Sequence, residues 1–362
     1  MKSWGYFAIM RADRFRFDGE EKCRLNDLPT DAGEEKDRRE EITAAFPDKL
    51  KKLSDLQNVF YADKKEGLII VLQALDAAGK DSLIRHVASG MNPQGVHVSC
   101  FKRPSTEELS HDYLWRVNNA LPRRGEIAIF NRSYYEDIIT AKVHHLKDTY
   151  EMAERVIGQS EDDFIDQRIR QVKNYESYLY ENSYRVVKVF LNVSKDEQKK
   201  RFLERIDRED KNWKFNAGDL DERDLFDEYK KTFESVITKT STKESPWYAL
   251  PADDKWYTRD LFADILIKAM EECHPVYPMP DVKKDELLAC RERLLSEDGG
   301  KEKKKEEKPS SSFQEKGVIA IEAEDDDELK GDAPEKLSSS RHKDGKKKKD
   351  KDKHRKKGKN HD

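Results

Sequence analysis

Apolar and polar positions alternate in blocks along about the first 280 residues, and the blocks predict strands and helices in turn. Leu68 to Leu72 is an unbroken apolar run, which is typical of a strand buried on both faces. Four further strands are expected at Val96 to Phe101, Glu126 to Asn131, Val186 to Val193 and Trp247 to Leu250. Because helical patterns separate these strands, the sequence predicts an α/β fold with a doubly wound, five-stranded parallel sheet and right-handed crossovers.

The expected helices carry apolar residues spaced by three and four positions. The first opens at Pro47, and its stripe is formed by Leu50, Leu53, Leu56 and Phe60. The others lie at 81–89, 105–117, 161–182, 194–208, 221–240 and 261–270, with one more after residue 133. A serine followed three residues later by glutamate predicts capped helix starts at Ser105, Ser133 and Ser194. Residues 1–45 show no clear pattern, but Phe15, Phe17 and Leu25 are expected to pack on the body.

Composition changes the picture after about residue 283. Of the 362 residues, 40% are charged and 36% hydrophobic, and the excess charge lies in this last part. We therefore expect an N-terminal extension (1–45), a folded body (46–282) and a disordered tail (283–362) that cannot bury a core. The tail is acidic at 322–335 and basic at 341–359. A solubilising tether is its simplest role, and electrostatic capture of a polyanion is the sharper alternative.

Net charge and cysteine usage exclude several classes of protein. The chain carries −4, and residues 341–362 hold twelve Lys and Arg against four Asp, so residues 1–340 carry −12. A body this acidic is not a general nucleic-acid binder. The four cysteines form no C-x-x-C pair, which fits a reducing compartment better than a zinc site or a disulfide framework. With no signal-peptide pattern and no membrane-length apolar run, we expect a cytoplasmic protein with no membrane partner.

The candidate chemistry begins directly after the first strand, in GLIIVLQALDAAGKDS. A strand, a loop of small residues, Lys80 and a helix together predict a phosphate cradle, because backbone N–H groups, the helix N-terminus and the lysine all present positive charge. The match to G-x-x-x-x-G-K-[ST] is imperfect, since Ala74 replaces the first glycine and Asp81 the Ser or Thr. The plain alternative is a tight turn with a solvated lysine.

Further charged groups follow the other strands, whose carboxyl ends share one edge of a parallel sheet. Lys102 and Arg103 follow the second strand, and Asn131, Arg132, Glu136 and Asp137 follow the third. Metal binding would use Asp76 with Glu136 or Asp137, because Asn131 stands where a typical kinase sheet has an aspartate. Glu136 has the alternative role of a helix cap. The histidines, His144 among them, show no spacing typical of a metal site.

The helix after the fourth strand carries three arginines on one face, Arg201, Arg205 and Arg208, at i, i+4 and i+7. Such a face favours an anion, and the alternative is a solvated surface paired with Glu204 or Glu209. The polar insert that follows brings Lys211 and Lys214 around Trp213. Movable cations of this kind are typical of a lid that closes over phosphates. We call residues 201–219 the lid segment.

Five segments in order resemble the polyphosphate kinase 2 family over about residues 45–280. They are LQALDAAGKDSLIRHV, MNPQGV followed by FKRPS, IFNRSYYEDI, LNVSKDEQKKRFLERID with KNWKF, and SPWYALPADDKW. With Asn131 in FNRS, the chain resembles the branch of the family that acts on both nucleoside mono- and diphosphates. The same branch also has alanine at position 74 and aspartate at position 81. Ser82 stands where the family usually has glycine.

The resemblance implies a P-loop kinase-like fold with a helical lid and a Mg²⁺-dependent phosphotransferase, with Mn²⁺ as an alternative ion. It implies inorganic polyphosphate and AMP, ADP and ATP as substrates, the guanine equivalents as further acceptors, a homo-oligomer and no specific nucleic acid. The implied metal-binding residues are Asp76 and Glu136. The implied catalytic residues are Asp76, Lys80, Arg132, Glu136, Arg201 and Arg205. The implied polyphosphate- and nucleotide-binding residues are Ala77, Ala78, Gly79, Asp81, Arg85, Lys102, Asn131, Arg208, Lys211 and Lys214.

Two other functions are compatible with the same residues. One is an ATP-dependent nucleotide kinase that uses the same loop. The other is a non-catalytic polyphosphate-binding module that acts through its lysine-rich tail. In the second case Lys80 would be dispensable and the tail would not.

Overall fold

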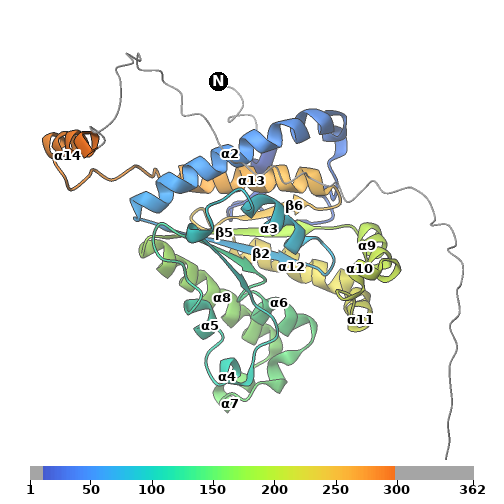
Figure 1. The fold of residues 1–362 in the computed structure, drawn as a ribbon. Coiled ribbons are helices and arrows are strands. Elements are labelled where there is room, and N and C mark those ends of the chain that lie inside the picture. The colour runs from blue at the N-terminus through green and yellow to red at the C-terminus, as the bar shows by residue number, and fades with distance from the viewer. Residues whose placement is uncertain (1–10, 298–362) are drawn as a thin grey trace, which may run out of the picture. The chain divides into compact units, whose positions relative to one another are not determined.

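A central sheet organises the computed structural model, which describes residues 11–297 (Figure 1). Within that range the sheet has six strands in the order β1-β6-β5-β2-β4-β3. Their bounds are β1 Arg16–Phe17, β2 Gly67–Ala74, β3 Val96–Cys100, β4 Ile127–Asn131, β5 Tyr184–Asn192 and β6 Trp247–Pro251. The five parallel strands confirm the predicted sheet. The short antiparallel β1 is an addition, because two residues are too few to leave a readable pattern.

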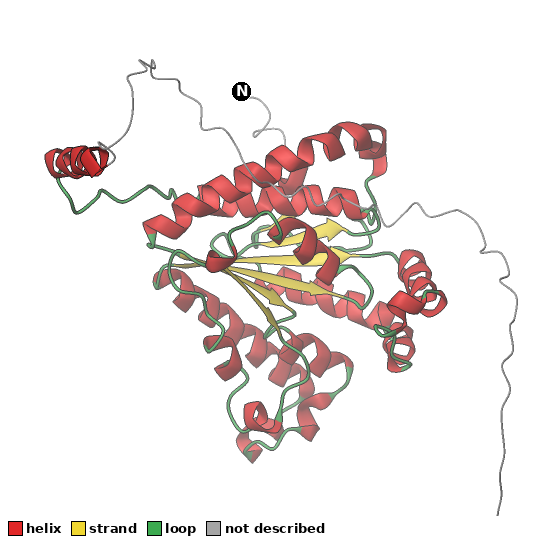
Figure 2. Ribbon diagram, viewed as in Figure 1, coloured by secondary structure: helices red, strands yellow, loops and turns green. Residues whose placement is uncertain are grey.

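Helices cover both faces of the sheet (Figures 1 and 2). One face carries α2 Arg39–Asp63, α3 Lys80–Ala88 and α13 Lys255–Glu271, and the other carries α6 Glu136–Val143, α8 Glu161–Glu181 and α12 Phe226–Thr240. Further helices are α4 Thr106–Leu109, α5 Trp115–Asn118, α7 Glu154–Ile157, α9 Lys195–Asp207, α10 Glu209–Asn212 and α11 Gly218–Asp224. Three 3₁₀ turns lie at Gly33–Arg38, Pro93–Gly95 and Leu146–Thr149. This arrangement confirms the doubly wound fold.

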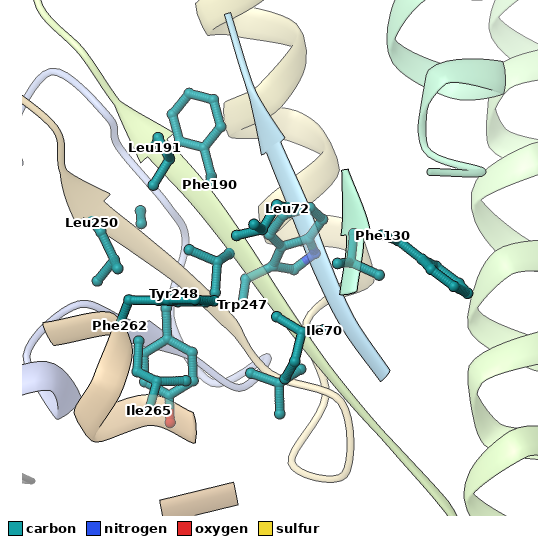
Figure 3. Packing of buried hydrophobic residues seen from close by; sticks show 14 of the residues in the cluster. Ile70, Leu72, Phe130, Phe190, Leu191, Trp247, Tyr248, Leu250, Phe262 and Ile265 are labelled. Atoms are coloured by element: carbon teal, nitrogen blue, oxygen red, sulfur yellow. The ribbon is translucent and has the colours of Figure 1, made fainter. Parts of the chain in front are cut away.

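The core lies where β2 passes between β4 and β5. Ile70 pairs with Ile129 on one side and Val187 on the other, and every residue from Leu68 to Leu72 is buried. Figure 3 shows core side chains from the strands and from α13, among them Leu72, Phe130, Phe190, Trp247 and Phe262. Burial on both faces explains the unbroken apolar run of this strand.

Several helix boundaries differ from those expected. The helix predicted to open at Pro47 begins at Arg39 and contains the proline, because packing of Leu53 and Phe60 outweighs one lost backbone hydrogen bond. Residues 105–117 form two short helices rather than one, and residues 221–240 are divided at Leu225. The last expected helix begins earlier, at Lys255.

Two of the three predicted serine caps are confirmed. Ser105 Oγ accepts from Glu108 N at 3.3 Å, while Glu108 Oε2 accepts from Ser105 N at 2.7 Å. Ser194 Oγ accepts from Glu197 N at 3.1 Å. The cap expected at Ser133 is wrong: α6 begins only at Glu136, and buried Ser133 instead contacts Gln73 of β2. Helix capping alone therefore does not explain Glu136.

The ends of the described range add two findings. Phe15, Phe17 and Leu25 are buried in the core, as expected. After residue 283, where disorder was expected, the structure has a helix, α14 Lys284–Glu297. Asp285 and Glu286 in its first turn and paired leucines seven residues apart are features that favour a helix. The acidic and basic stretches of the tail lie outside the described residues. None of the helices within 11–297 is long and apolar enough to cross a membrane.

Buried carboxylates join α13 to α2. Lys49 Nζ contacts both Asp260 and Asp264, the latter at 2.9 Å, and both carboxylates are buried. Burial raises the pKa of Asp264 to about 6, although Lys49 and Arg11 oppose the rise and Asp260 adds to it. Because the folded-state pKa exceeds the ordinary value of 3.8, stability from this group is present at low pH and is lost as pH rises through 6.

Asp264→Asn should therefore become more stable relative to the wild type as pH rises. Between pH 5 and pH 8 the difference in the free energy of unfolding should grow in favour of the variant by about 1.4 kcal/mol. Urea denaturation at both pH values measures it. Asp166→Asn removes an exposed carboxylate paired with Lys239 and serves as control, with a pH-independent difference expected. A pH-independent difference for Asp264→Asn would contradict the assignment.

Candidate active site

The loop between β2 and α3 has the backbone of a phosphate cradle. Ala77 and Gly79 adopt positive φ, at 60° and 106°, and the second value favours glycine strongly because a side chain there would be strained. The α3 helix begins at the next residue, Lys80, so its unpaired N–H groups face the loop. Strand, loop and helix thus follow one another as the sequence predicted, and the cradle presents partial positive charge.

Lys80 lies across this loop. Its Nζ donates to the carbonyls of Ala74 at 3.0 Å and Leu75 at 3.4 Å. Burial of the ammonium lowers the pKa of Lys80, while the Asp76 carboxylate raises it. A partly desolvated ammonium bonded only to neutral carbonyls has much to gain from a phosphate oxygen, because hydrogen bonds between two charged groups are the stronger kind.

Asp76, Arg132 and Glu136 form the centre of the site. Arg132 Nη2 donates to Asp76 Oδ1 at 2.9 Å, and its Nη1 lies 4.0 Å from Glu136 Oε2. Burial alone would lower the pKa of Arg132, but the Glu136 and Asp76 carboxylates outweigh it and raise the pKa. The guanidinium therefore stays charged between two carboxylates from different elements. This brings together three of the residues predicted to be catalytic.

The three residues line a cleft of about 150 Å³. Its walls also include residues that sequence reasoning missed: Gln198, Glu222 and Tyr229. Tyr229 donates to Glu222 Oε2 at 2.7 Å, and His144 Nε2 lies 3.0 Å from the same oxygen. Gln198, Glu222 and Tyr229 come from α9, α11 and α12, and no motif at their positions connects them to the loop. Only the fold brings them to the cleft.

Arg201 does not share an open face with Arg205 and Arg208, contrary to the spacing argument. Its side chain is buried, and its five N–H groups are all engaged. Nη1 donates to the carbonyls of Ala77 and Ala78, at 3.1 and 2.7 Å, and Nη2 donates to those of Ala252 and Asp253, at 2.7 and 3.0 Å. Nε bonds Glu197 at 2.9 Å. The guanidinium thus joins the loop to the end of β6.

Three other cations of the lid segment, Arg205, Arg208 and Lys211, pair with carboxylates within it. Arg205 lies 3.5 Å from Asp219, and Arg208 pairs with both Glu204 and Asp210. The pairing of Arg208 with Glu204 is the alternative that the sequence left open. Lys211 contacts Glu204 at 2.6 Å, and Lys214 lies over the ring of the largely exposed Trp213.

The remaining predicted residues lie around the loop. Asn131 Nδ2 donates to Asp81 Oδ1 at 2.7 Å, which joins the end of β4 to the start of α3. Arg85 and Lys102 are exposed. Asp137 is not among the residues that line the cleft. Burial raises the pKa of its carboxyl group to about 6, although the neighbouring Arg168 and Arg116 oppose the rise.

A divalent cation fits the donor set only in part. Within residues 11–297, no three His, Cys, Asp or Glu side chains are placed to hold a metal ion. Asp76 and Glu136, on either side of Arg132, supply two carboxylates. Mg²⁺ is usually bound by one or two carboxylates together with substrate phosphates and water. The residues therefore fit an ion that is completed by a phosphate substrate.

Comparisons with known proteins place the sequence and the fold in one family. The sequence model of the family described as Polyphosphate kinase 2 matches residues 35–276. An "ADP-polyphosphate phosphotransferase" of Rhodopseudomonas palustris is 42% identical over 289 residues, which cover 79% of this chain and 99% of the relative. An "AMP/ADP-polyphosphate phosphotransferase" of Meiothermus ruber is 40% identical over 238 residues, covering 66% and 84%. The crystal structure of Polyphosphate Kinase 2 from Arthrobacter aurescens superposes with a TM-score of 0.68 at 32% identity, over 79% and 96% of the two chains.

Proposed function

The chain belongs to the polyphosphate kinase 2 family, and on this premise we propose that it transfers the terminal phosphoryl group between inorganic polyphosphate and nucleotides. The observation that carries the proposal is the convergence of Lys80, Asp76, Arg132 and Glu136 at one phosphate cradle. Positive groups there are placed for the charge that phosphoryl transfer spreads over oxygen atoms.

AMP and ADP are the proposed acceptors, with GMP and GDP as further ones. The name of the Meiothermus ruber relative, which includes both AMP and ADP, supports this range. Asn131 supports it too, because the resembling branch has asparagine at this position. The side chain at the end of β4 is a neutral amide that donates to Asp81, so it adds no negative charge beside that carboxylate.

The transfer needs positioning more than acid–base chemistry. An oxygen of the nucleotide phosphate attacks the terminal phosphorus in line, the bridging P–O bond breaks, and the shortened polyphosphate leaves with that oxygen. Because the attacking oxygen is already ionised, no strong base is required. We assign Lys80 and the α3 N-terminus to the transferred group and Arg132 to the charge that develops during transfer.

Asp76 and Glu136 are the residues that would hold Mg²⁺, with Mn²⁺ as a substitute. When bound, the ion neutralises phosphate charge, which lowers the repulsion between two anionic substrates. Arg205, Lys211 and Lys214 of the lid segment would close over the phosphates and exclude water. Since Arg201 is fixed to the loop, the part of the lid segment that moves would begin after it.

The test is transfer from polyphosphate to AMP and to ADP, with Mg²⁺ and without ATP, followed by chromatography of the nucleotides. We expect AMP to become ADP and then ATP, and excess EDTA to stop the reaction. Conversion of ADP alone would contradict the acceptor range. If neither nucleotide reacts in a folded sample, the ATP-dependent kinase, tested with ATP as sole donor, becomes the better hypothesis.

We further propose a homo-oligomer that works in the cytoplasm. The tendency of the family to form oligomers supports the first, and the scattered, unpatterned cysteines support the second.

A further inference from the structure

A buried ionic cluster lies behind the active site. Glu176 of α8 is 2% exposed and Lys188 of β5 is fully buried, and the two are 2.5 Å apart. Glu176 also accepts from Ser245 Oγ at 2.9 Å and, on its other oxygen, from the hydroxyls of Tyr134 at 2.8 Å and Tyr135 at 2.9 Å. Four donors thus satisfy one carboxylate. Buried charges are costly, so such a cluster calls for an explanation.

The two tyrosines belong to the short segment that carries the active-site residues. Arg132 precedes them, and Glu136 follows at the start of α6. Arg132 has a φ of 65°, a conformation that costs a non-glycine residue free energy and persists only where the surroundings enforce it. Its backbone N–H donates to the carbonyl of Leu72 at 3.0 Å, which fixes one end of the segment to β2.

A buried side chain of β2 fixes the other end of the segment, at Glu136. Gln73 of β2 is fully buried and lies between Ser133 and Glu136. In the orientation that satisfies both neighbours, its amide nitrogen donates to Glu136 Oε1 at 2.9 Å and its oxygen accepts from Ser133 Oγ at 3.0 Å. The segment 132–136 is therefore held from the β2 side by Leu72 and Gln73, and from the α8 side by Glu176.

We propose that Glu176 is a positioning residue, which holds Arg132 and Glu136 at the phosphate cradle by anchoring the hydroxyls of Tyr134 and Tyr135. Both hydroxyls donate to the same oxygen, Glu176 Oε1, so one carboxylate fixes the two rings. Lys188 then serves as counter-ion for the anchor, and its Nζ also donates to the carbonyl of Thr240 at 2.9 Å. The inference rests on the proposed function.

Stability alone is a weaker explanation of the cluster. A buried ion pair can often be replaced by apolar residues of similar size without loss of stability. Such a replacement would instead lose the exact placement of Arg132 and Glu136. A displacement of about 1 Å at a reacting group can reduce the rate about a hundredfold. The tyrosine rings would still fill the core, but the segment that bears Arg132 would lose its anchor on the α8 side and keep only the contacts with Leu72 and Gln73 of β2.

Two double variants separate these explanations. Glu176→Gln with Lys188→Met removes both charges, but the amide oxygen still accepts from the two tyrosines. Glu176→Leu with Lys188→Met removes the same charges and also removes the acceptor that the two hydroxyls share. With polyphosphate and ADP, we expect the glutamine variant to retain kcat within threefold of the wild type. The leucine variant should lose kcat at least tenfold, with KM for polyphosphate within twofold because Lys80 and its loop are untouched.

Tyr134→Phe with Tyr135→Phe provides a second route should the leucine variant not fold, and the same loss of kcat is expected. Tyr257→Phe is the matched control. Tyr257 belongs to α13, which packs on the opposite face of the sheet, and its buried hydroxyl accepts a hydrogen bond from Arg14. Its kcat should stay within twofold. Equal kcat in the two double variants, or normal kcat in the phenylalanine pair, would overturn the inference. An inactive wild type would instead overturn the proposed function.

Discussion

Replacing Lys80 by alanine is expected to reduce phosphoryl transfer about a thousandfold without harm to the fold. Removing one group that stabilises charge in a transition state costs about a hundredfold to a thousandfold, and here the lost group carries a full charge at the cradle. The folded protein should be no less stable. Burial lowers the pKa of Lys80, which means that folding disfavours the ammonium and that alanine relieves this cost.

The measurement is kcat/KM for polyphosphate together with thermal unfolding followed by circular dichroism. Lys65→Ala is the matched control, because Lys65 is exposed and lies before β2, at the opposite end of the same strand. Its activity should match the wild type. A folded Lys80→Ala protein with turnover near normal would remove Lys80 from the mechanism and leave it only its bonds to the loop carbonyls.

Arg201→Lys is the second large effect, and it should lower stability and activity together. A lysine has three donors on one nitrogen, so it cannot satisfy carbonyls of the loop and of the β6 end at once. We expect a loss of about 2–4 kcal/mol in the free energy of unfolding, because buried carbonyls are left without partners. Activity should fall about a hundredfold, since Ala77 and Ala78 belong to the cradle.

Arg205→Lys distinguishes this positioning role from direct contact with phosphate. Arg205 is partly exposed and bonded only weakly to Asp219, so its replacement should reduce activity with little change in stability. Urea denaturation and steady-state kinetics of both variants measure the contrast. If Arg201→Lys kept its stability and lost only kcat, Arg201 would contact phosphate, as the sequence implied.

The sequence predicted those features that repeat along the chain or lie close together in it. Alternating apolar runs located five strands, and the spacing of Ser105 with Glu108 and of Ser194 with Glu197 located two caps. The loop from Ala74 to Lys80 was readable because its chemistry is local: small residues, a glycine and a lysine between a strand and a helix.

The features that it missed depend on what lies opposite each residue. The spacing of Arg201, Arg205 and Arg208 fixes a helix face but does not reveal that loop carbonyls bury the first of them. Glu222 reaches the cleft from α11, ninety residues after Arg132. Glu176 looked like one more polar position on α8, and only the packing of α8 on β5 shows that it receives four hydrogen bonds.

The pairing of β1 with β6 has a consequence for the order in which the chain assembles on the ribosome. Arg16 and Phe17 are translated more than two hundred residues before their partners, Tyr248 and Trp247. The same holds for the backbone N–H groups of Cys23 and Ala32, which donate to the side chains of Thr238 and Asp254. The segment 16–32 must therefore stay without these partners until more than two hundred further residues have been made. Contacts so distant in sequence form late, and a nascent chain that carries such a segment is a natural substrate for chaperones.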